Sequence, residues 1–178
     1  MDDVDAIIAQ VVEGDHLNDI GVLKRREIEA CVLAPIVAAL AQEFDAIAVL
    51  RIVGETIRRI ARAQGRSPAR RSGGQSIGHL AASMNAWTRE SALELKVLEK
   101  TKDRLSFDVT RCRYAELYRA LGLEKLGAIL SCNRDSTWVE GFSDEIGLTR
   151  TQTILEGAPC CDFRYQNQRR VSDREPKP

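Results

Sequence analysis

The 178-residue sequence lacks an excess of either charge, because lysine plus arginine and aspartate plus glutamate both total 26. A general nucleic-acid binder needs surplus cations to release counterions, so nucleic acid is not an expected partner. The sequence also lacks an apolar run of roughly 18 residues, so no membrane partner is expected. Its acidic start, MDDVDAIIAQ, has neither the basic nor the apolar region of a signal peptide. These absences predict a cytoplasmic protein.

Short metal-binding knuckles are missing as well. The five cysteines include no Cys-x2–4-Cys spacing, which structural zinc sites usually contain. Cys112, Cys132 and Cys161 come nearest to a ligand set, but they are 20 and 29 residues apart. No metal and no cofactor is therefore expected, although a zinc-binding domain is kept as an alternative. Thiols in a reducing cytoplasm stay free of disulfides, which makes them candidates for chemistry.

The first half of the sequence reads as helical. Apolar residues recur at three- and four-residue spacing in residues 28–44 and again in residues 49–60, a pattern typical of two amphipathic helices. Pro35 lies inside the first stripe and is expected to kink or break that helix. Residues 65–76 are polar and rich in glycine, which predicts a connector. A further helix is expected over residues 76–90.

The second half changes to alternating patterns. Residues 93–109 contain two alternating runs separated by a turn, which indicates a β-hairpin. Residues 114–130 are helical in pattern, with Gly122 dividing them into two helices. A second strand pair is expected from residues 146–154 and 161–165, joined across a Gly-Ala-Pro turn.

This order of elements predicts an α+β fold, in which a helical N-terminal half packs on a small antiparallel sheet with the order β-β-α-α-β-β. We expect one domain over residues 1–167, with a helical layer in residues 1–90 and a sheet-containing half in residues 91–167. Residues 168–178 contain one apolar residue, Val171, and are expected to form a disordered tail.

Cys112 is the best-placed thiol on physical grounds. It closes the strand LSFDVTR and precedes a helix, where unpaired amides and the helix dipole favour a thiolate. The flanking Arg111 and Arg113 are expected to lower the pKa of this thiol further. The alternative is a small buried side chain at the junction of two elements.

Other candidate residues lie downstream. Cys132 and Asp135 fall in SCNRD, where the carboxylate can act on the thiol as a base or orienting group, or instead cap the next helix. Cys161 shares a strand face with Phe163, so it forms either core or pocket wall. Arg150, in a polar strand of a sheet that packs against helices, must face either water or a pocket anion.

Two segments, FDVTRCRYAELYRALGLEKLGAILSCNRD (107–135) and LTRTQTILEGAPCCDFRY (148–165), carry a family resemblance, with a weaker match in residues 86–100. In them the chain resembles the L-2-amino-thiazoline-4-carboxylic acid hydrolase family. The resemblance implies an enzyme that hydrolyses a carbon–nitrogen bond in a small cyclic substrate. The positions that it implies as catalytic are Cys112, Cys132, Asp135 and Cys161.

The leading hypothesis is a cysteine-dependent hydrolase that opens a C–N bond in a small cyclic amide or amidine, similar to a thiazoline carboxylate. Arg111 or Arg150 would bind a substrate carboxylate through a charge-assisted pair. The competing hypothesis is a non-catalytic small-ligand-binding or thiol-sensing domain. A homo-oligomer stays open under either hypothesis.

Overall fold

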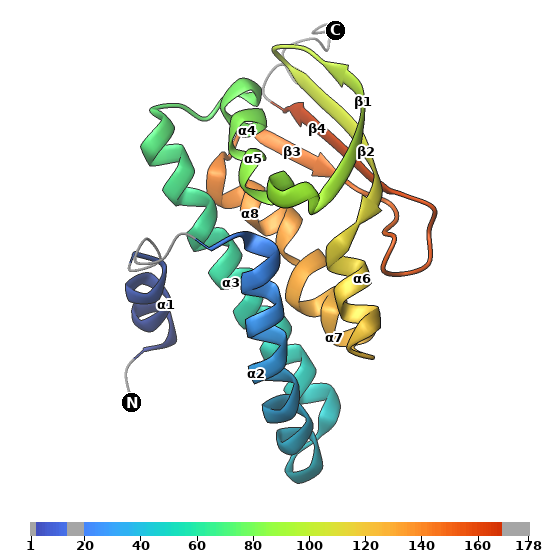
Figure 1. The fold of residues 1–178 in the computed structure, drawn as a ribbon. Coiled ribbons are helices and arrows are strands. Elements are labelled where there is room, and N and C mark those ends of the chain that lie inside the picture. The colour runs from blue at the N-terminus through green and yellow to red at the C-terminus, as the bar shows by residue number, and fades with distance from the viewer. Residues whose placement is uncertain (1–2, 14–19, 169–178) are drawn as a thin grey trace, which may run out of the picture.

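The computed structural model describes residues 3–13 and 20–168. Its first half is helical, as the apolar spacing predicts. The helices of this half are α1 (Val4–Glu13), α2 (Val22–Glu43), α3 (Ala46–Ser72), α4 (Ile77–Ser83), α5 (Asn85–Thr88) and a 3-10 turn (Arg89–Ser91). Figure 1 shows α2 and α3 as a long antiparallel hairpin whose connected ends extend away from the sheet.

The second half contains the sheet and further short helices. Its elements are β1 (Leu93–Lys100), β2 (Arg104–Cys112), α6 (Arg113–Ala120), α7 (Glu124–Gly127), a π-helical turn (Ala128–Cys132), α8 (Arg134–Phe142), β3 (Ile146–Thr149) and β4 (Cys161–Asn167). Gly122, at a φ of 68°, separates α6 from α7, because glycine adopts this left-handed conformation at little cost. The α+β fold class is confirmed.

The four strands form one antiparallel sheet in the order β1-β2-β4-β3. The hairpin predicted over residues 93–109 is the β1–β2 pair, in which Val97 lies opposite Phe107. β4 pairs with β2 through Phe107 and Phe163, and it pairs with β3 on its other side. Chain segments distant in sequence therefore meet on the central strands.

One face of the sheet packs on the helices and forms the main hydrophobic core. Its buried members include Ala61, Ala69, Ile77, Leu80, Leu105, Phe107, Val109, Val139, Phe142 and Tyr165. A second cluster joins α2, α3, α6 and the π-helical turn through Ala30, Ile57, Tyr118 and Leu130. The opposite sheet face is polar and holds the ion pair of Asp108 with Arg164 at 2.7 Å.

The helices differ from the expectations in two places, since α2 is not broken at Pro35 and the predicted connector is largely helical. α2 continues through Pro35, because that proline and Cys31, whose carbonyl loses its amide partner, both lie on the exposed side. The connector predicted over residues 65–76 is largely part of α3, which ends at Ser72. The hydropathy pattern missed this extension because the residue that packs into the core there is the small Ala69.

The second strand pair is shorter than predicted. β3 ends at Thr149, so residues 150–154 lie in the loop before β4 rather than in a strand. Asp162 holds this loop by accepting the backbone N–H groups of Thr151 and Gln152, both at 2.9 Å. Of the predicted tail, only Gln168 falls within the described residues, and its N–H donates to the carbonyl of Glu145 at 2.7 Å.

α3 and α8 cross in backbone contact at two glycines. A Cβ atom at Gly65 would overlap the carbonyl oxygen of Trp138, and a Cβ atom at Gly141 would overlap that of Arg62. Both obstacles are backbone atoms, which cannot move aside as a flexible side chain can. This crossing positions α8, which carries three of the site residues described below, Arg134, Asp135 and Trp138.

Replacing Gly65 with alanine should therefore destabilise the protein by about 2–3 kcal/mol, the usual cost of overpacking. Gly54→Ala is the matched control in the same helix, because its Cβ would meet Ile129 at an ordinary 3.7 Å. Alanine favours a helix over glycine, so the control should be neutral or stabilising by up to about 1 kcal/mol. Urea unfolding of both variants measures the difference. Equal stabilities would show that the helices do not need this close approach.

Candidate active site

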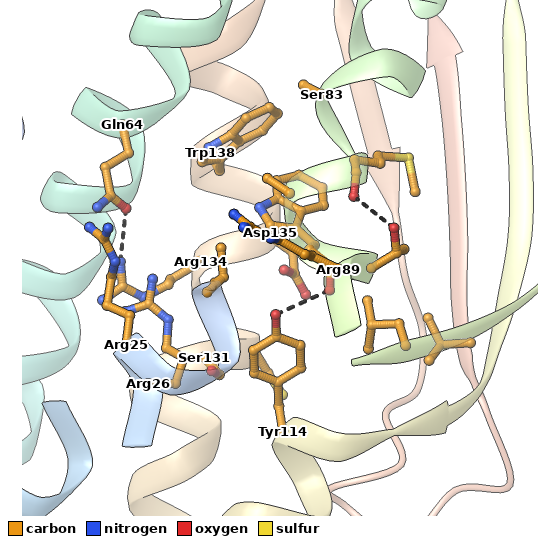
Figure 2. A pocket seen from close by; sticks show the side chains of 18 of the residues that line it. Arg25, Arg26, Gln64, Ser83, Arg89, Tyr114, Ser131, Arg134, Asp135 and Trp138 are labelled. Atoms are coloured by element: carbon orange, nitrogen blue, oxygen red, sulfur yellow. Dashed lines mark hydrogen bonds between the residues drawn. The ribbon is translucent and has the colours of Figure 1, made fainter. Parts of the chain in front are cut away.

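A cavity of about 790 Å³ lies between the helices and the inner face of the sheet. It is lined by four sequence-predicted catalytic positions and one predicted substrate-binding position: Cys112, Cys132, Asp135, Cys161 and Arg150. Figure 2 shows part of this pocket, with Asp135 and Tyr114 facing its centre. The structure thus brings together residues that are spread over fifty positions of the sequence.

Cys112 lies where β2 ends and α6 begins, as the sequence predicts. Its Sγ atom caps α6 by accepting the backbone N–H of Ala115 at 3.4 Å. Burial nevertheless raises the pKa of this thiol, while the amides of Ala115 and Tyr114 act in the opposite direction. The expectation of a depressed pKa is therefore wrong, because desolvation outweighs the amide contacts.

The two arginines beside Cys112 do not act on it as expected. Arg111 is exposed and forms ion pairs with Glu116 at 2.7 Å and Glu94 at 3.4 Å. Arg113 donates to the backbone carbonyl of Glu90 at 2.8 Å. Arg111 is not among the residues that line the pocket, so the structure does not bring it to the position of a substrate-binding residue.

Asp135 and Cys132 meet through Arg150. The guanidinium of Arg150 forms an ion pair with Asp135 and donates to the carbonyl of Cys132 at 3.1 Å. It also lies 5.8 Å from the centroid of the Phe163 ring. Arg150 therefore faces the pocket, one of the two positions expected for it, and fixes the carboxylate of Asp135.

Burial dominates the electrostatics of this pair of site residues. It raises the pKa of Asp135 to about 6, although the positive charges of Arg150 and Arg134 lower it. Burial, followed by the negative charge of Asp135, raises the pKa of the Cys132 thiol to about 12. The Asp135 side chain remains 32% exposed, so a pocket ligand can reach it. A carboxyl with a pKa near neutrality can both accept and donate a proton.

Cys161 forms both core and pocket wall, the two readings that the sequence left open. Its Sγ accepts the backbone N–H of Ile154 at 3.1 Å, and burial raises its pKa to about 11. The neighbouring Cys160 accepts from the side chain of Gln152 at 3.0 Å and does not line the pocket. Cys31 is exposed on α2. Three of the five thiols are thus at the site.

The sequence analysis missed two buried arginines at the pocket. Arg26 on α2 and Arg134 on α8 are 5% and 8% exposed, and both pair with Glu29. Arg134 also donates to Gln64 at 3.1 Å, a contact drawn in Figure 2. No local pattern marks these residues, because Arg134 and Glu29 are 105 positions apart.

Aromatic side chains supply much of the remaining wall. Six of them line the cavity: Trp87, Phe107, Tyr114, Trp138, Phe163 and Tyr165. Trp87 and Trp138 contact each other edge to face at 4.6 Å between centroids, and Phe107 stacks on Phe163 at 5.1 Å. The Tyr114 hydroxyl donates to the backbone carbonyl of Trp87 at 3.2 Å, which fixes the wall to α6.

Within residues 3–13 and 20–168, no three histidine, cysteine, aspartate or glutamate side chains are placed to hold a metal ion. The three pocket thiols therefore do not form the ligand set that the zinc alternative requires. No helix in the described part of the chain combines the length and hydropathy needed to cross a bilayer.

Comparison with known proteins gives a family match and one similar solved structure. The family model described as L-2-amino-thiazoline-4-carboxylic acid hydrolase matches residues 25–165. None of the curated proteins matches this chain. Among solved structures, the chain is similar to a trafficking protein particle complex subunit 3 from Naegleria fowleri, covalently bound to palmitic acid. The identity is 12% and the TM-score 0.47, over 80% of this chain and 95% of the other.

Proposed function

Because the chain belongs to the L-2-amino-thiazoline-4-carboxylic acid hydrolase family, we propose that its pocket hydrolyses a carbon–nitrogen bond in a small cyclic amide or amidine. The observation that carries this proposal is the convergence of Cys112 and Asp135 on one cavity. A thiol supplies a nucleophile for an electron-poor ring carbon, and a nearby carboxyl can move the protons that ring opening requires.

Cys112 is the favoured nucleophile among the three pocket thiols. Its Sγ caps α6, so the thiolate that forms during attack is stabilised by backbone amides. Cys132 and Cys161, with pKa values raised to about 12 and about 11, are harder to ionise and serve as wall. Asp135 is assigned as the group that accepts and donates the thiol proton, because no histidine is among the described residues that line the pocket.

The reaction then has two halves. In the first, Asp135 accepts the Cys112 proton, Sγ bonds to the ring carbon, and the ring nitrogen leaves with that proton. In the second, Asp135 accepts a proton from water, whose oxygen displaces Sγ, and the proton returns to the thiolate. Arg150 holds the carboxylate in place by pairing with it and with the carbonyl of Cys132. Each half uses the carboxyl of Asp135, whose pKa of about 6 suits proton transfer in both directions.

A non-catalytic small-ligand-binding pocket is the second candidate. The raised pKa of all three pocket thiols favours it, because a protonated thiol is a weak nucleophile. Incubation with a panel of cyclic amides, amidines and thiazoline carboxylates separates the two. The proposal expects a product heavier by one water. Binding of panel members with no product would favour the second candidate, and a new thiol from a thiazoline would show that the C–S bond breaks instead.

A further inference from the structure

The pocket is larger than a bare thiazoline carboxylate requires, and its arginines and its tryptophans form two separate parts of the wall. We propose that its substrate is a carboxylate with a bulky aromatic substituent, whose anionic group binds at Arg26 and Arg134 and whose aromatic group lies against Trp87 and Trp138. This refines the substrate class of the proposed function and rests on it for turnover, but the binding itself does not require hydrolysis.

The arginine end of the pocket brings two buried cations together. Arg26 and Arg134 share Glu29, which lies 3.4 Å from the Nη2 atom of Arg134. Burial and the charge of Arg26 lower the pKa of Arg134 to about 10, while the charges of Glu29 and Asp135 act in the opposite direction. Two buried cations beside a pocket favour an added anion, because buried charge is costly unless it is well paired.

The arginines of the lining are divided between two places. Arg150 pairs with Asp135, whereas Arg26 and Arg134 share Glu29. Figure 2 shows Arg25, Arg26 and Arg134 on one side of the pocket near Gln64, with Trp138 and Asp135 toward its middle. An anion bound at the arginines would therefore leave the rest of the ligand extending past Asp135.

The remaining wall fits an aromatic group rather than a second polar one. Trp138 is 9% exposed, stacks on Phe142 at 5.5 Å between centroids and meets Trp87 edge to face. Trp87 is half-buried, so its ring remains accessible to an aromatic group of a ligand. Met84 and Leu93 line the same cavity. The volume of about 790 Å³ lies in the upper part of the roughly 300–1,000 Å³ range for drug-sized ligands. A single five-membered ring would leave most of it unfilled.

The chain contains two tryptophans, and both line this pocket, so tryptophan fluorescence reports binding directly. Phenylbutyrate, butyrate and phenylbutanol are titrated into the full chain. We expect phenylbutyrate to bind at least about tenfold more tightly than either comparison compound, since each lacks one of the two groups. Equal affinity for phenylbutanol would overturn the anion site, and equal affinity for butyrate would overturn the aromatic site.

Arg26→Gln should weaken phenylbutyrate binding about tenfold and leave phenylbutanol binding unchanged. The matched control is Arg51→Gln on α3, whose partner Glu55 lies on the surface, and it should bind as the native chain does. If Arg26→Gln does not fold, the three-compound comparison on the native chain still decides the proposal. If the protein binds phenylbutyrate but opens none of the cyclic amides or amidines, the proposed hydrolase function is wrong and the proposed binding site is still supported.

A separate observation concerns the outer face of α2. The apolar stripe of residues 28–44 does not enter the core. It is exposed at Ile28, Val32, Ile36 and Leu40, by 49%, 55%, 49% and 39%. Contiguous apolar patches of this kind mark interfaces in folded proteins. Phe44 and Ile47 extend the patch around the α2–α3 turn.

We infer that a second copy of this chain covers the stripe, with the two α2 helices antiparallel. Lys24, which pairs with Glu27 of the same helix at 2.9 Å, lies near the start of α2, and Glu43 lies at its end. An antiparallel pair about a two-fold axis places each lysine near the glutamate of the other copy, and it opposes the two helix dipoles favourably. A parallel pair would bring like charges together at both ends.

Sedimentation of the full chain tests this pairing. We expect a dimer for the native chain and a monomer when Val32→Glu and Ile36→Glu are combined, because buried glutamates would be unpaired at the interface. Val97→Glu with Leu98→Glu is the matched control, since these residues are 58% and 48% exposed on β1, and it should stay dimeric. A native monomer, or a dimer that survives the α2 substitutions, would overturn the inference.

Discussion

Replacing Cys112 with serine is expected to lower kcat for ring opening by at least about a thousandfold, as removal of a nucleophile does in other hydrolases. Serine is close to cysteine in size and can still accept the amide of Ala115, so α6 should remain capped. The hydroxyl, however, is a far weaker nucleophile at neutral pH. Product formation by mass spectrometry, with circular dichroism as a check of folding, measures the effect.

Cys160→Ser is the matched control for this substitution. Cys160 lies outside the pocket lining, next to a thiol that lines it, so its replacement should leave kcat within about twofold. A fully active Cys112→Ser protein together with an inactive Cys132→Ser or Cys161→Ser protein would contradict the assignment. Cys112 would then be a capping residue, and the nucleophile would be one of the other two thiols.

Asp135→Asn should lower kcat by about two to four orders of magnitude, the usual contribution of a general acid–base group. In the native protein, kcat/KM should fall as the pH drops below about 6, the value to which burial raises the pKa of Asp135. The sign follows from its role, since a protonated carboxyl cannot accept the thiol proton. The residual activity of the Asp135→Asn variant should lack this decrease at low pH, the acid limb of the pH profile. An acid limb that persists in the variant would belong to another group.

Arg150→Gln separates a positioning role from a structural one. The charge of Arg150 lowers the pKa of Asp135 against the effect of burial, so its removal should move the acid limb to higher pH. A purely structural arginine would change the rate or the stability of the protein but leave the position of the limb unchanged. The pH profile of kcat/KM therefore distinguishes the two roles.

The sequence patterns predicted those parts of the fold that depend on neighbouring residues. The alternation in residues 93–109 identified the β1–β2 hairpin, and the strand-to-helix junction placed Cys112 correctly at the start of α6. Arg150 was placed in a strand, whereas it lies in the loop after β3, although its side chain does face the pocket. Arg150 faces the pocket because it pairs with Asp135 on α8, a helix that lies elsewhere in the sequence.

Features that arise from long-range packing were beyond the sequence. The apolar stripe of α2 predicted an amphipathic helix, but periodicity does not show which side of a helix the rest of the protein covers. The pKa of Cys112 was expected to fall, because flanking arginines are visible in sequence whereas desolvation by the pocket is not. Arg26 and Arg134 carry no local signal, since they meet only when α2 and α8 pack around Glu29.

Trapping the covalent intermediate tests the central claim most directly. Asp135 acts in both halves of the reaction, so the trap uses the native protein. Acid quenching during turnover of any cyclic amide or amidine that it hydrolyses should retain the covalent adduct before water displaces it. Intact-protein mass spectrometry followed by peptide mapping locates it. The account predicts one substrate-derived adduct per chain on the peptide containing Cys112. An adduct confined to Cys132 or Cys161, or ring opening by the native protein that continues in its Cys112→Ser variant, would contradict it.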